Sequence, residues 1–376
     1  MNFGFDEDQR SLADTVAQQL ADFPRLTAPE LMPLEDDSVW RALADLGLFA
    51  LLVPERNEGV GLSLVDLALA VEALGAGLAP PSVVSTLIAT DAIARHGSDL
   101  QQRALLPKIA VGQLKVAIAL LESDAGYGAD AVRTAFTAGT LRGEKILVAD
   151  AAAADLLMVV ARGEDGPVII MVDPGAPGVT LRPHDDLDPS SGHCAVMFDR
   201  VKLGDDAVLG QAAPARAVDR LLDVAATLHA GLAMGIAGLM LDKAVEYAKT
   251  RVQFGQAIGA FQAIKHRCAD MAVAVEAGRS AAYYAFWTAA EEAPDRARAS
   301  SMAKAYCGDV ARHVCNETIQ VHGGMGFTWE LGLHRFLRRS KVIEHAYGDA
   351  VWHNERILSA TLATMNAAPR RDQDAA

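Results

Sequence analysis

The stretch Leu221–Gln262 reads LLDVAATLHAGLAMGIAGLMLDKAVEYAKTRVQFGQAIGAFQ and indicates more about the fold than any other. Its apolar residues recur every three or four positions over about five turns, which predicts one long amphipathic helix. They are Leu221, Ala225, Leu228, Leu232, Ile236 and Leu239. We expect the helix to run from Pro214 to about Val252, well beyond the ~11–12 residues of an average helix. A helix this long and this apolar is typical of a helical bundle.

The helical period continues downstream of this stretch. Three or four further helices are expected, at about 261–291, 295–322, 331–346 and 349–364. Residues 211–376 are therefore predicted to form a C-terminal helical bundle. The polar tail after Met365 is expected to fray.

The pattern upstream of Pro214 is different. Short apolar runs rich in β-branched residues, punctuated by Gly and Pro, predict a middle β domain over 114–210. The expected strands are Val116–Leu121, Val132–Leu141, Leu156–Ala161, Val168–Val172 and Ala195–Leu203. Before them, residues 1–113 show helical spacing again, for example over Leu12–Phe23 and over Val83–Arg95. The predicted fold class is α+β, mostly α: an N-terminal helical domain, a β domain and a helical bundle.

Composition excludes several kinds of partner. The 376 residues carry 34 basic and 48 acidic side chains, a net charge of −14, which argues against nucleic acid as a main partner. No apolar run approaches ~20 residues, so no membrane span is expected, and the polar start shows no secretory signal. The four cysteines form no C-x-x-C pair and no metal cluster, which favours a reduced, cytoplasmic setting and no bound metal. They are Cys194, Cys268, Cys307 and Cys315.

One candidate site follows directly on the long helix. It is Arg251-Val-Gln253-Phe254-Gly255, with Gln262 downstream. An arginine at such a place presents a planar fork of donors to a phosphate, and glycine lets a backbone approach closely. The alternative is an ordinary helix corner with an ion pair between helices.

A second candidate is Gln320-Val-His322-Gly323-Gly324-Met325-Gly326. Closely spaced glycines end the preceding helix and expose backbone N–H groups, which can hold an anion or a ribose. The alternative is a glycine-rich helix cap. The spacing is not that of a G-x-G-x-x-G fingerprint, and no strand precedes it.

A third cluster lies in the N-terminal region, and a helix–loop–helix corner explains it well. It comprises Gly47-Leu48, Val53-Pro54-Glu55, Gly59, Gly61, Asp66, Glu72 and Gly75. Together and in this order, the three clusters resemble the acyl-CoA dehydrogenase family, from about Phe5 to Leu362. The resemblance implies an FAD enzyme that oxidises the α,β carbon–carbon bond of an acyl-CoA thioester. It also implies an assembly of two dimers.

The resemblance assigns roles to the first two clusters. In the family, the matching arginine binds the FAD pyrophosphate, which points to Arg251. The other matching positions contact the ADP half of the FAD that the neighbouring subunit binds. They are Phe254, Gln262, Gln320, Gly323 and Gly324.

The sequence departs from the family where the flavin ring should bind. The family has a T-E-P-x-x-G-S-D-like segment in the β domain, and here the matching stretch is Ser123–Asp130, with Ala129 in place of the second hydroxyl. A W-I-T/S-like strand normally packs on the ring, and here it reads Leu147-Val148-Ala149. The aromatic platform and its hydroxyl are both missing, although the backbone N–H of Ala149 remains.

The catalytic base is missing as well. Abstraction of the α-proton needs a carboxylate, and the two family positions hold Tyr347 and Ala225. A phenol has a reference pKa of ~10 and is a poor base near neutral pH. The nearby acids are out of register and are expected to be solvated surface charges. They are Asp223, Glu344 and Asp349.

These features leave three functions open. The first, which we favour, is a subunit of a heteromeric acyl-CoA dehydrogenase. It supplies the ADP half of the FAD site to a partner chain, and that partner carries the catalytic base within an α2β2 assembly. The second is a self-sufficient homotetramer with a displaced base such as Asp223. The third is an acyl-CoA-binding paralogue without activity. The family includes heteromeric enzymes of bacterial steroid side-chain catabolism, so a steroid-CoA is a candidate substrate.

Two smaller questions also stay open at this stage. Gly231, Gly235 and Gly238 on the long helix can permit close helix packing or leave room for a bulky acyl group, and packing is the preferred interpretation. His322 and His345 are interpreted as structural, because they lie near helix ends.

Overall fold

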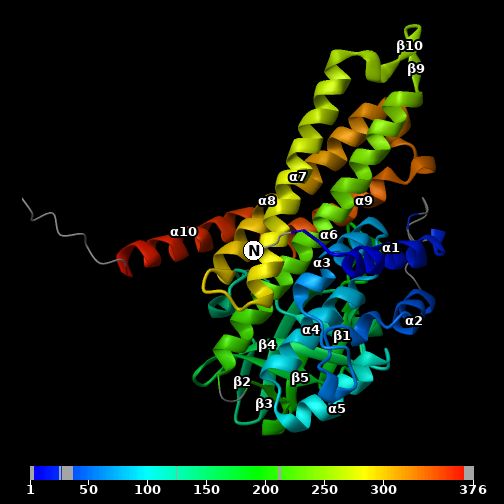
Figure 1. Ribbon diagram of the computed structural model, residues 1–376. Coiled ribbons are helices and arrows are strands. Elements are labelled where there is room, and N and C mark those ends of the chain that lie inside the picture. Colours follow the sequence, from blue (N-terminus) through cyan, green and yellow to red (C-terminus); the bar gives the residue numbers. More distant parts are fainter. Residues whose placement is uncertain (1–3, 25–26, 28–36, 124, 211–212, 368–376) are drawn as a thin grey trace, which may run out of the picture.

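The computed structural model describes residues 4–24, 27, 37–123, 125–210 and 213–367. Helices come first, then a sheet, then a bundle of long helices (Figure 1). The sheet lies at one end of the molecule, and the bundle extends away from it to a short hairpin at the opposite end (Figure 1). The predicted fold class, α+β with mostly helices, is therefore correct.

The described residues of the N-terminal part form five α-helices, and short 3₁₀ turns connect the second of them to the third. Asp6 begins the first of them with a reciprocal capping box to Gln9. Pro81 occupies the first turn of another, where the missing N–H costs nothing. The helices are α1 (Glu7–Ala21), α2 (Ser38–Asp45), α3 (Ala68–Ala76), α4 (Pro81–His96) and α5 (Asp99–Ala110).

The middle part is one sheet with the strand order β6-β7-β3-β2-β4-β5-β8, and β1 pairs with β4 in parallel. The single strand predicted over Val132–Leu141 is wrong. Ala138 and Gly139 both have positive φ and turn the chain, so the segment divides into two antiparallel strands. The strands are β1 (Val116–Ala119), β2 (Ala135–Thr137), β3 (Thr140–Val148), β4 (Leu156–Gly163), β5 (Gly166–Val172), β6 (Val179–Pro183), β7 (Cys194–Lys202) and β8 (Val208–Leu209).

The C-terminal part is built on α6 (Pro214–Thr250), which has 37 residues. A two-stranded hairpin follows it, formed by β9 (Val252–Gln253) and β10 (Gln256–Ala257). The chain then continues through α7 (Gln262–Ala290), α8 (Arg296–His322), α9 (Leu333–His345) and α10 (Ala350–Ala367). In Figure 1, α10 starts at the body of the molecule and extends away from it.

Glycines bring α3 and α6 into close backbone contact. A Cβ on Gly235 would lie 1.9 Å from the carbonyl oxygen of Glu72, and a Cβ on Gly75 would lie 2.2 Å from that of Leu232. Any side chain at either position would separate the helices. The glycines of α6 thus serve helix packing, as the preferred interpretation had it, and they leave no added room.

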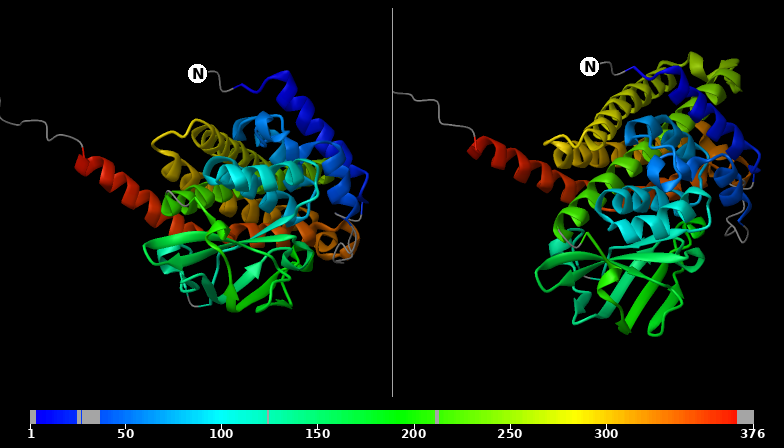
Figure 2. Two further views of the ribbon diagram at one scale, coloured as in Figure 1. Left: turned by 90° about the horizontal axis from the view of Figure 1, so that it is seen from below. Right: turned by 60° about the horizontal axis from the view of Figure 1, so that its bottom comes forward.

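The α6 helix joins the parts of the molecule. It contacts α3 and α4 of the N-terminal part, β5 of the sheet and the other bundle helices (Figure 2). By length and composition α6 could also cross a membrane, but 78% of its most apolar window is buried inside the fold. Burial of that kind is what a core helix shows.

Candidate functional site

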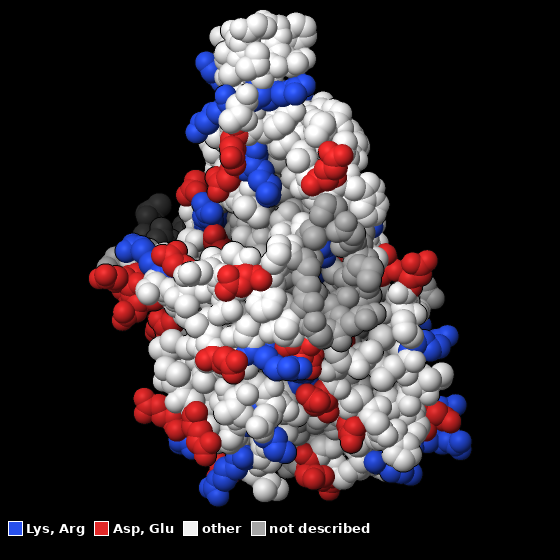
Figure 3. Space-filling view, turned by 90° about the vertical axis from the view of Figure 1, so that its right-hand side faces the viewer, with Lys and Arg blue, Asp and Glu red and all other residues white. Residues whose placement is uncertain are grey.

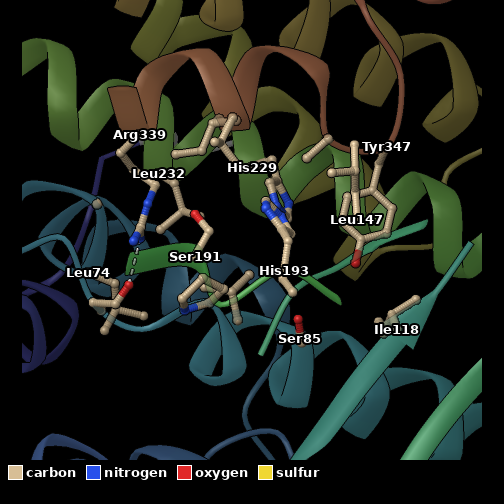
Figure 4. A pocket seen from close by; sticks show the side chains of 18 of the residues that line it. Leu74, Ser85, Ile118, Leu147, Ser191, His193, His229, Leu232, Arg339 and Tyr347 are labelled. Carbon is tan, nitrogen blue, oxygen red and sulfur yellow. Dashed lines mark hydrogen bonds between the residues drawn. The ribbon is translucent and has the colours of Figure 1, made fainter. Parts of the chain in front are cut away.

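A cavity lies where the three parts of the molecule meet. Its walls come from α3 and α4, from the edge of the sheet, from the middle of α6 and from α9 (Figure 4). It encloses about 790 Å³ of space free of atoms, part of which is open to solvent. Most of the lining is aliphatic, with a few polar side chains among it. The polar ones are Ser85, Ser191, His193, His229, Arg339 and Tyr347.

Tyr347 and His229 face each other at one end of this cavity (Figure 4). Their ring centroids are 4.8 Å apart, with the planes tilted by 59°. Burial raises the pKa of the Tyr347 phenol well above its usual value, and a hydrogen bond with Ser85 offsets this only in part. Burial also lowers the pKa of His229 to about 3, and the nearby charge of Lys304 lowers it further. At neutral pH both side chains are therefore uncharged.

The second family position for a base, Ala225, is fully buried on α6. Asp223, two residues before Ala225, is not a displaced base. Asp223 is buried rather than solvated, so the expectation of a surface charge is wrong. Its carboxylate accepts from Arg296 at 2.9 Å and from Arg356 at 2.8 Å. Because both oxygens serve these arginines, Asp223 is a structural ion-pair centre between α6, α8 and α10.

The acids that flank Tyr347 also have structural partners. Glu344 accepts from Arg312 at 3.0 Å, and Asp349 accepts the backbone N–H of Trp352 at 2.9 Å at the start of α10. Neither is among the residues that line the cavity. Of the residues that the structure describes, those lining the cavity include no Asp and no Glu.

A buried lysine holds the segment that carries Tyr347. The ammonium of Lys304 donates to the carbonyl oxygens of Glu344 at 2.9 Å and of Gly348 at 2.8 Å. Tyr347 lies between these two acceptors and has a positive φ of 57°. Burial lowers the pKa of Lys304 to about 7. Lys304 therefore holds the backbone on both sides of Tyr347 and stabilises its strained conformation.

The opposite end of the cavity carries an arginine whose charge is already neutralised. Arg339 donates to the carboxylate of Asp188 at 2.6 Å and to the hydroxyl of Ser190 at 2.9 Å. It also donates to the carbonyl oxygen of Ala79 at 2.9 Å, which lies at the cavity (Figure 4). The Arg339 charge also holds the pKa of Asp188 down, to about 2. Arg339 thus ties α9 to the connection between α3 and α4 and to the connection between β6 and β7, and it is not a free anion site.

A buried ion pair holds the strand that leads to Leu147 and Ala149, the residues expected at the flavin ring. Lys145 donates to Glu122 at 2.7 Å, and Glu122 also accepts the backbone N–H groups of Arg133 and Thr134. The strand that leaves Lys145 carries Leu147 and Ala149 into the cavity wall. Leu147 has a positive φ of 51° and is 44% exposed. Asp124 lies outside the described residues.

The residues expected to bind the ADP half lie at the other end of the bundle. Arg251 closes α6, Phe254 and Gly255 form the hairpin turn, and Gln262 opens α7. All of these side chains are exposed, and Phe254 is 92% exposed. Within the described residues Arg251 makes no ion pair, so the alternative of a salt-bridged helix corner does not hold. Other basic side chains gather below the hairpin (Figure 3), including Lys249 and Lys265.

The glycine-rich segment reaches the same end of the bundle. The ring of His322 stacks on that of Tyr247 at 4.2 Å, one turn before Arg251. Gln320 is exposed near the end of α8. Gly323 has a φ of 59° and stops the helix. The backbone does not require a glycine at position 324, because φ of Gly324 is not positive. A Cβ on Gly324 would also meet no described atom within 4 Å. The fold of this chain alone does not explain that glycine.

Sequence reasoning did not identify His229, Lys304 or Arg339 as parts of the site. His229 carried a detectable signal, because it lies four residues after Ala225 and so on the same face of the helix. Lys304 and Arg339 showed none, since both look like ordinary surface charges on amphipathic helices. No group of three metal-ligating side chains gathers in the part of the chain that the structure describes.

Comparison with known proteins identifies the family. Residues 6–113 match the family model of the acyl-CoA dehydrogenase N-terminal domain, and residues 215–362 match that of the C-terminal domain. A probable acyl-CoA dehydrogenase of Bacillus subtilis, YngJ, is 31% identical over 329 residues, which cover 82% of this chain and 85% of the relative.

Solved structures of the same fold cover nearly all of the chain. Butyryl-CoA dehydrogenase from Megasphaera elsdenii matches with a TM-score of 0.88 and 27% identity over 96% of this chain and all of that one. The Tcur3481–Tcur3483 steroid dehydrogenase (ACAD) matches at 0.85 and 29%, over 96% and 99%. The ChsE4–ChsE5 complex from Mycobacterium tuberculosis matches at 0.87 and 25%, over 98% and 100%. This chain therefore belongs to the acyl-CoA dehydrogenase family of FAD-dependent oxidoreductases.

Proposed function

We propose that this chain is the subunit of a heteromeric acyl-CoA dehydrogenase that supplies the ADP half of an FAD site to a partner chain. One observation carries the proposal. Arg251 follows His229 by 22 residues of one continuous helix. At ~1.5 Å per residue, the distance along the helix between the two residues is roughly 33 Å. One FAD cannot span both the cavity of this chain and the tip of its bundle, by which we mean the end that carries Arg251, the hairpin and the glycine-rich segment. The distance supports a role of the tip of the bundle at a flavin held by another chain, and the missing base described below supports a partner of unlike sequence.

The residues at the tip are suited to that task. The guanidinium of Arg251, which pairs with no acid among the described residues, offers a planar pair of donors to a pyrophosphate. Phe254 offers an exposed aromatic face, and Gln262 and Gln320 offer amide donors and acceptors. The open space over Gly323 and Gly324 allows a ligand to approach the backbone closely.

The cavity of this chain is not suited to the chemical step. When bound, FAD accepts a hydride from the β-carbon, and a carboxylate must take the α-proton. Tyr347 and Ala225 stand at the two family positions, and no carboxylate of a described residue lines the cavity. Because the pKa of Tyr347 is raised, its phenol holds its proton at neutral pH. The base is therefore assigned to the partner chain.

The two competing functions have less support. A self-sufficient enzyme with a displaced base needs a free acid at the cavity, and Asp223 is bound by Arg296 and Arg356 instead. A paralogue that only binds acyl-CoA has no use for the exposed set at the tip of the bundle.

The chemical class of the substrate is an acyl-CoA thioester, and we propose a steroid-CoA within that class. The similarity to the Tcur3481–Tcur3483 steroid dehydrogenase and to the ChsE4–ChsE5 complex supports both this substrate and an α2β2 assembly. We also propose a cytoplasmic location, which four free thiols support.

Turnover of the assembled complex tests the division of labour. Replacing the catalytic glutamate of the partner by glutamine should lower turnover by ~10²–10⁴-fold, the usual contribution of a positioned base. Tyr347→Phe in this chain should leave turnover at the wild-type level, at matched FAD content. A comparable collapse in Tyr347→Phe would place the chemistry in this chain and refute the proposal.

A further inference from the structure

Tyr347 and His229 form a polar pair whose hydrogen-bonding sense is fixed by the fold. The Nδ1 atom of His229 lies 2.8 Å from the carbonyl oxygen of Ala225. A carbonyl only accepts, so Nδ1 carries the proton. The other ring nitrogen, Nε2, then presents a lone pair, and no described residue is recorded as bonding to it. His229 is therefore an acceptor at the cavity.

Tyr347 is the matching donor. Its phenol keeps its proton at neutral pH because burial raises its pKa. The hydroxyl of Ser85 is a hydrogen-bond partner of the phenol, and because a serine hydroxyl can donate, the phenol proton can go to a ligand instead. Both rings come from helix-anchored segments: His229 from the middle of α6, and Tyr347 from the loop that Lys304 holds. The pair is thus preorganised.

The rest of the cavity offers little else that is polar and free. Arg339 is neutralised by Asp188, and His193 is paired with Asp186. The remaining walls are aliphatic, and they include Leu74, Leu147 and Ile236. A ligand of this cavity therefore has an apolar body and one polar group at the end where Tyr347 and His229 meet.

Tyr347 and His229 together also determine which polar group of a ligand binds best. A carbonyl oxygen would accept from Tyr347 but would leave Nε2 of His229 unpaired, which costs ~1–3 kcal/mol when buried. An ammonium group only donates, so it would leave the phenol proton of Tyr347 without an acceptor. A hydroxyl group satisfies both partners, because its oxygen accepts from Tyr347 and its proton goes to His229.

We propose that this cavity binds an apolar ligand through one hydroxyl group, held between the phenol of Tyr347 and Nε2 of His229. The site is a binding site without turnover, and it rests on the proposed function, which places the chemistry in the partner chain. The hydroxyl can belong to a free alcohol, as in a sterol ring, or to a hydroxyacyl thioester.

Calorimetric titration of the full-length chain in its assembled complex tests this, with 1-octanol and its isomer methyl heptyl ether as probes. Both can accept from Tyr347, but only the alcohol can donate to His229. The alcohol should bind roughly 5- to 10-fold more tightly, the value of one buried hydrogen bond. A second pair, 3-hydroxyoctanoyl-CoA and octanoyl-CoA, shows whether the hydroxyl belongs to a thioester.

Two variants assign any preference to the proposed residues. His229→Phe should abolish the preference for the alcohol, whereas Tyr347→Phe should weaken alcohol and ether alike by roughly 5-fold. Tyr306→Phe, an exposed tyrosine on α8 away from the cavity, should change neither. Equal binding of both probes by the wild type, or a preference that survives His229→Phe, would overturn the inference. Neither result bears on the proposed function, which is tested by the turnover and the FAD content of the complex.

Discussion

The two ends of the site differ in how their residues are used. Around the cavity, the polar side chains are mostly bound to partners within this chain: Asp223 to two arginines, Arg339 to Asp188, and Lys304 to two carbonyl oxygens. At the tip of the bundle, Arg251 and Phe254 are exposed, and Arg251 has no ion pair with any described residue.

This difference shows which residues the fold itself requires. Substitutions around the cavity should change the stability of the chain, because they leave buried partners unsatisfied. Substitutions at the tip should leave stability unchanged and alter what binds there. The four predictions below test this contrast.

The largest effect is expected for Asp223→Asn. The change leaves Arg296 and Arg356 facing a neutral amide inside the bundle, which should cost about 3 kcal/mol of unfolding free energy. Denaturant unfolding measures this loss. Turnover per folded complex should be unchanged, and a loss of turnover without a loss of stability would make Asp223 the displaced base.

Arg251→Ala should act in the opposite way. It removes a charge-assisted contact worth ~1.5–3 kcal/mol, so the FAD affinity of the complex should fall by roughly 10- to 150-fold. The unfolding free energy of the FAD-free chain should stay the same. Arg251→Lys should restore binding only in part, because an ammonium lacks the planar fork.

The neighbouring cation supplies the control for this experiment. Lys249 lies on the same exposed helix end, so Lys249→Ala removes an equal charge without the proposed contact. It should lower FAD affinity much less than Arg251→Ala does. Equal effects of the two variants would mean that only the general positive charge matters.

A pair of glycines gives the same contrast without any change of charge. Gly235→Ala places a Cβ 1.9 Å from the carbonyl oxygen of Glu72 and should cost ~1–3 kcal/mol of stability. Gly324→Ala meets nothing within the chain and should not destabilise it. It should weaken FAD binding if a ligand approaches that backbone. Thermal unfolding and FAD titration of both variants decide the matter.

The last prediction concerns the dependence of stability on pH rather than the loss of a single contact. The pKa of Lys304 is lowered to about 7 in the folded chain from 10.5, so the unfolded chain binds more protons between these values. Stability from this group therefore rises with pH from about 7 to 10, by at most ~1.4 kcal/mol per pH unit. Lys304→Met should show a flatter dependence over the same window. Parallel slopes would mean that Lys304 stays charged in the fold.

The sequence predicted the helices well because their periodicity is long and strong. The expected helix over 295–322 is α8 to within one residue at its start. The sheet was predicted less well. Short strands have weak patterns, so β6 was not predicted and the turn at Ala138 and Gly139 was not foreseen.

The functional residues also differ in how well the sequence predicts them. Residues at the tip could be found in the sequence because they stand together in two short motifs. The cavity could not, because Ser85, His229 and Tyr347 come from three distant segments that only the fold brings together. The status of Asp223 was equally hidden, since its partners Arg296 and Arg356 lie 73 and 133 positions away.

The FAD content of the purified complex tests the central claim most directly. If this chain supplies only the ADP half of a site whose base and flavin ring belong to its partner, the complex should hold one FAD for each pair of unlike chains. Arg251→Ala should then weaken FAD binding at every one of these sites. One FAD per chain, or a stable yellow oligomer of this chain alone that oxidises acyl-CoA, would contradict the claim.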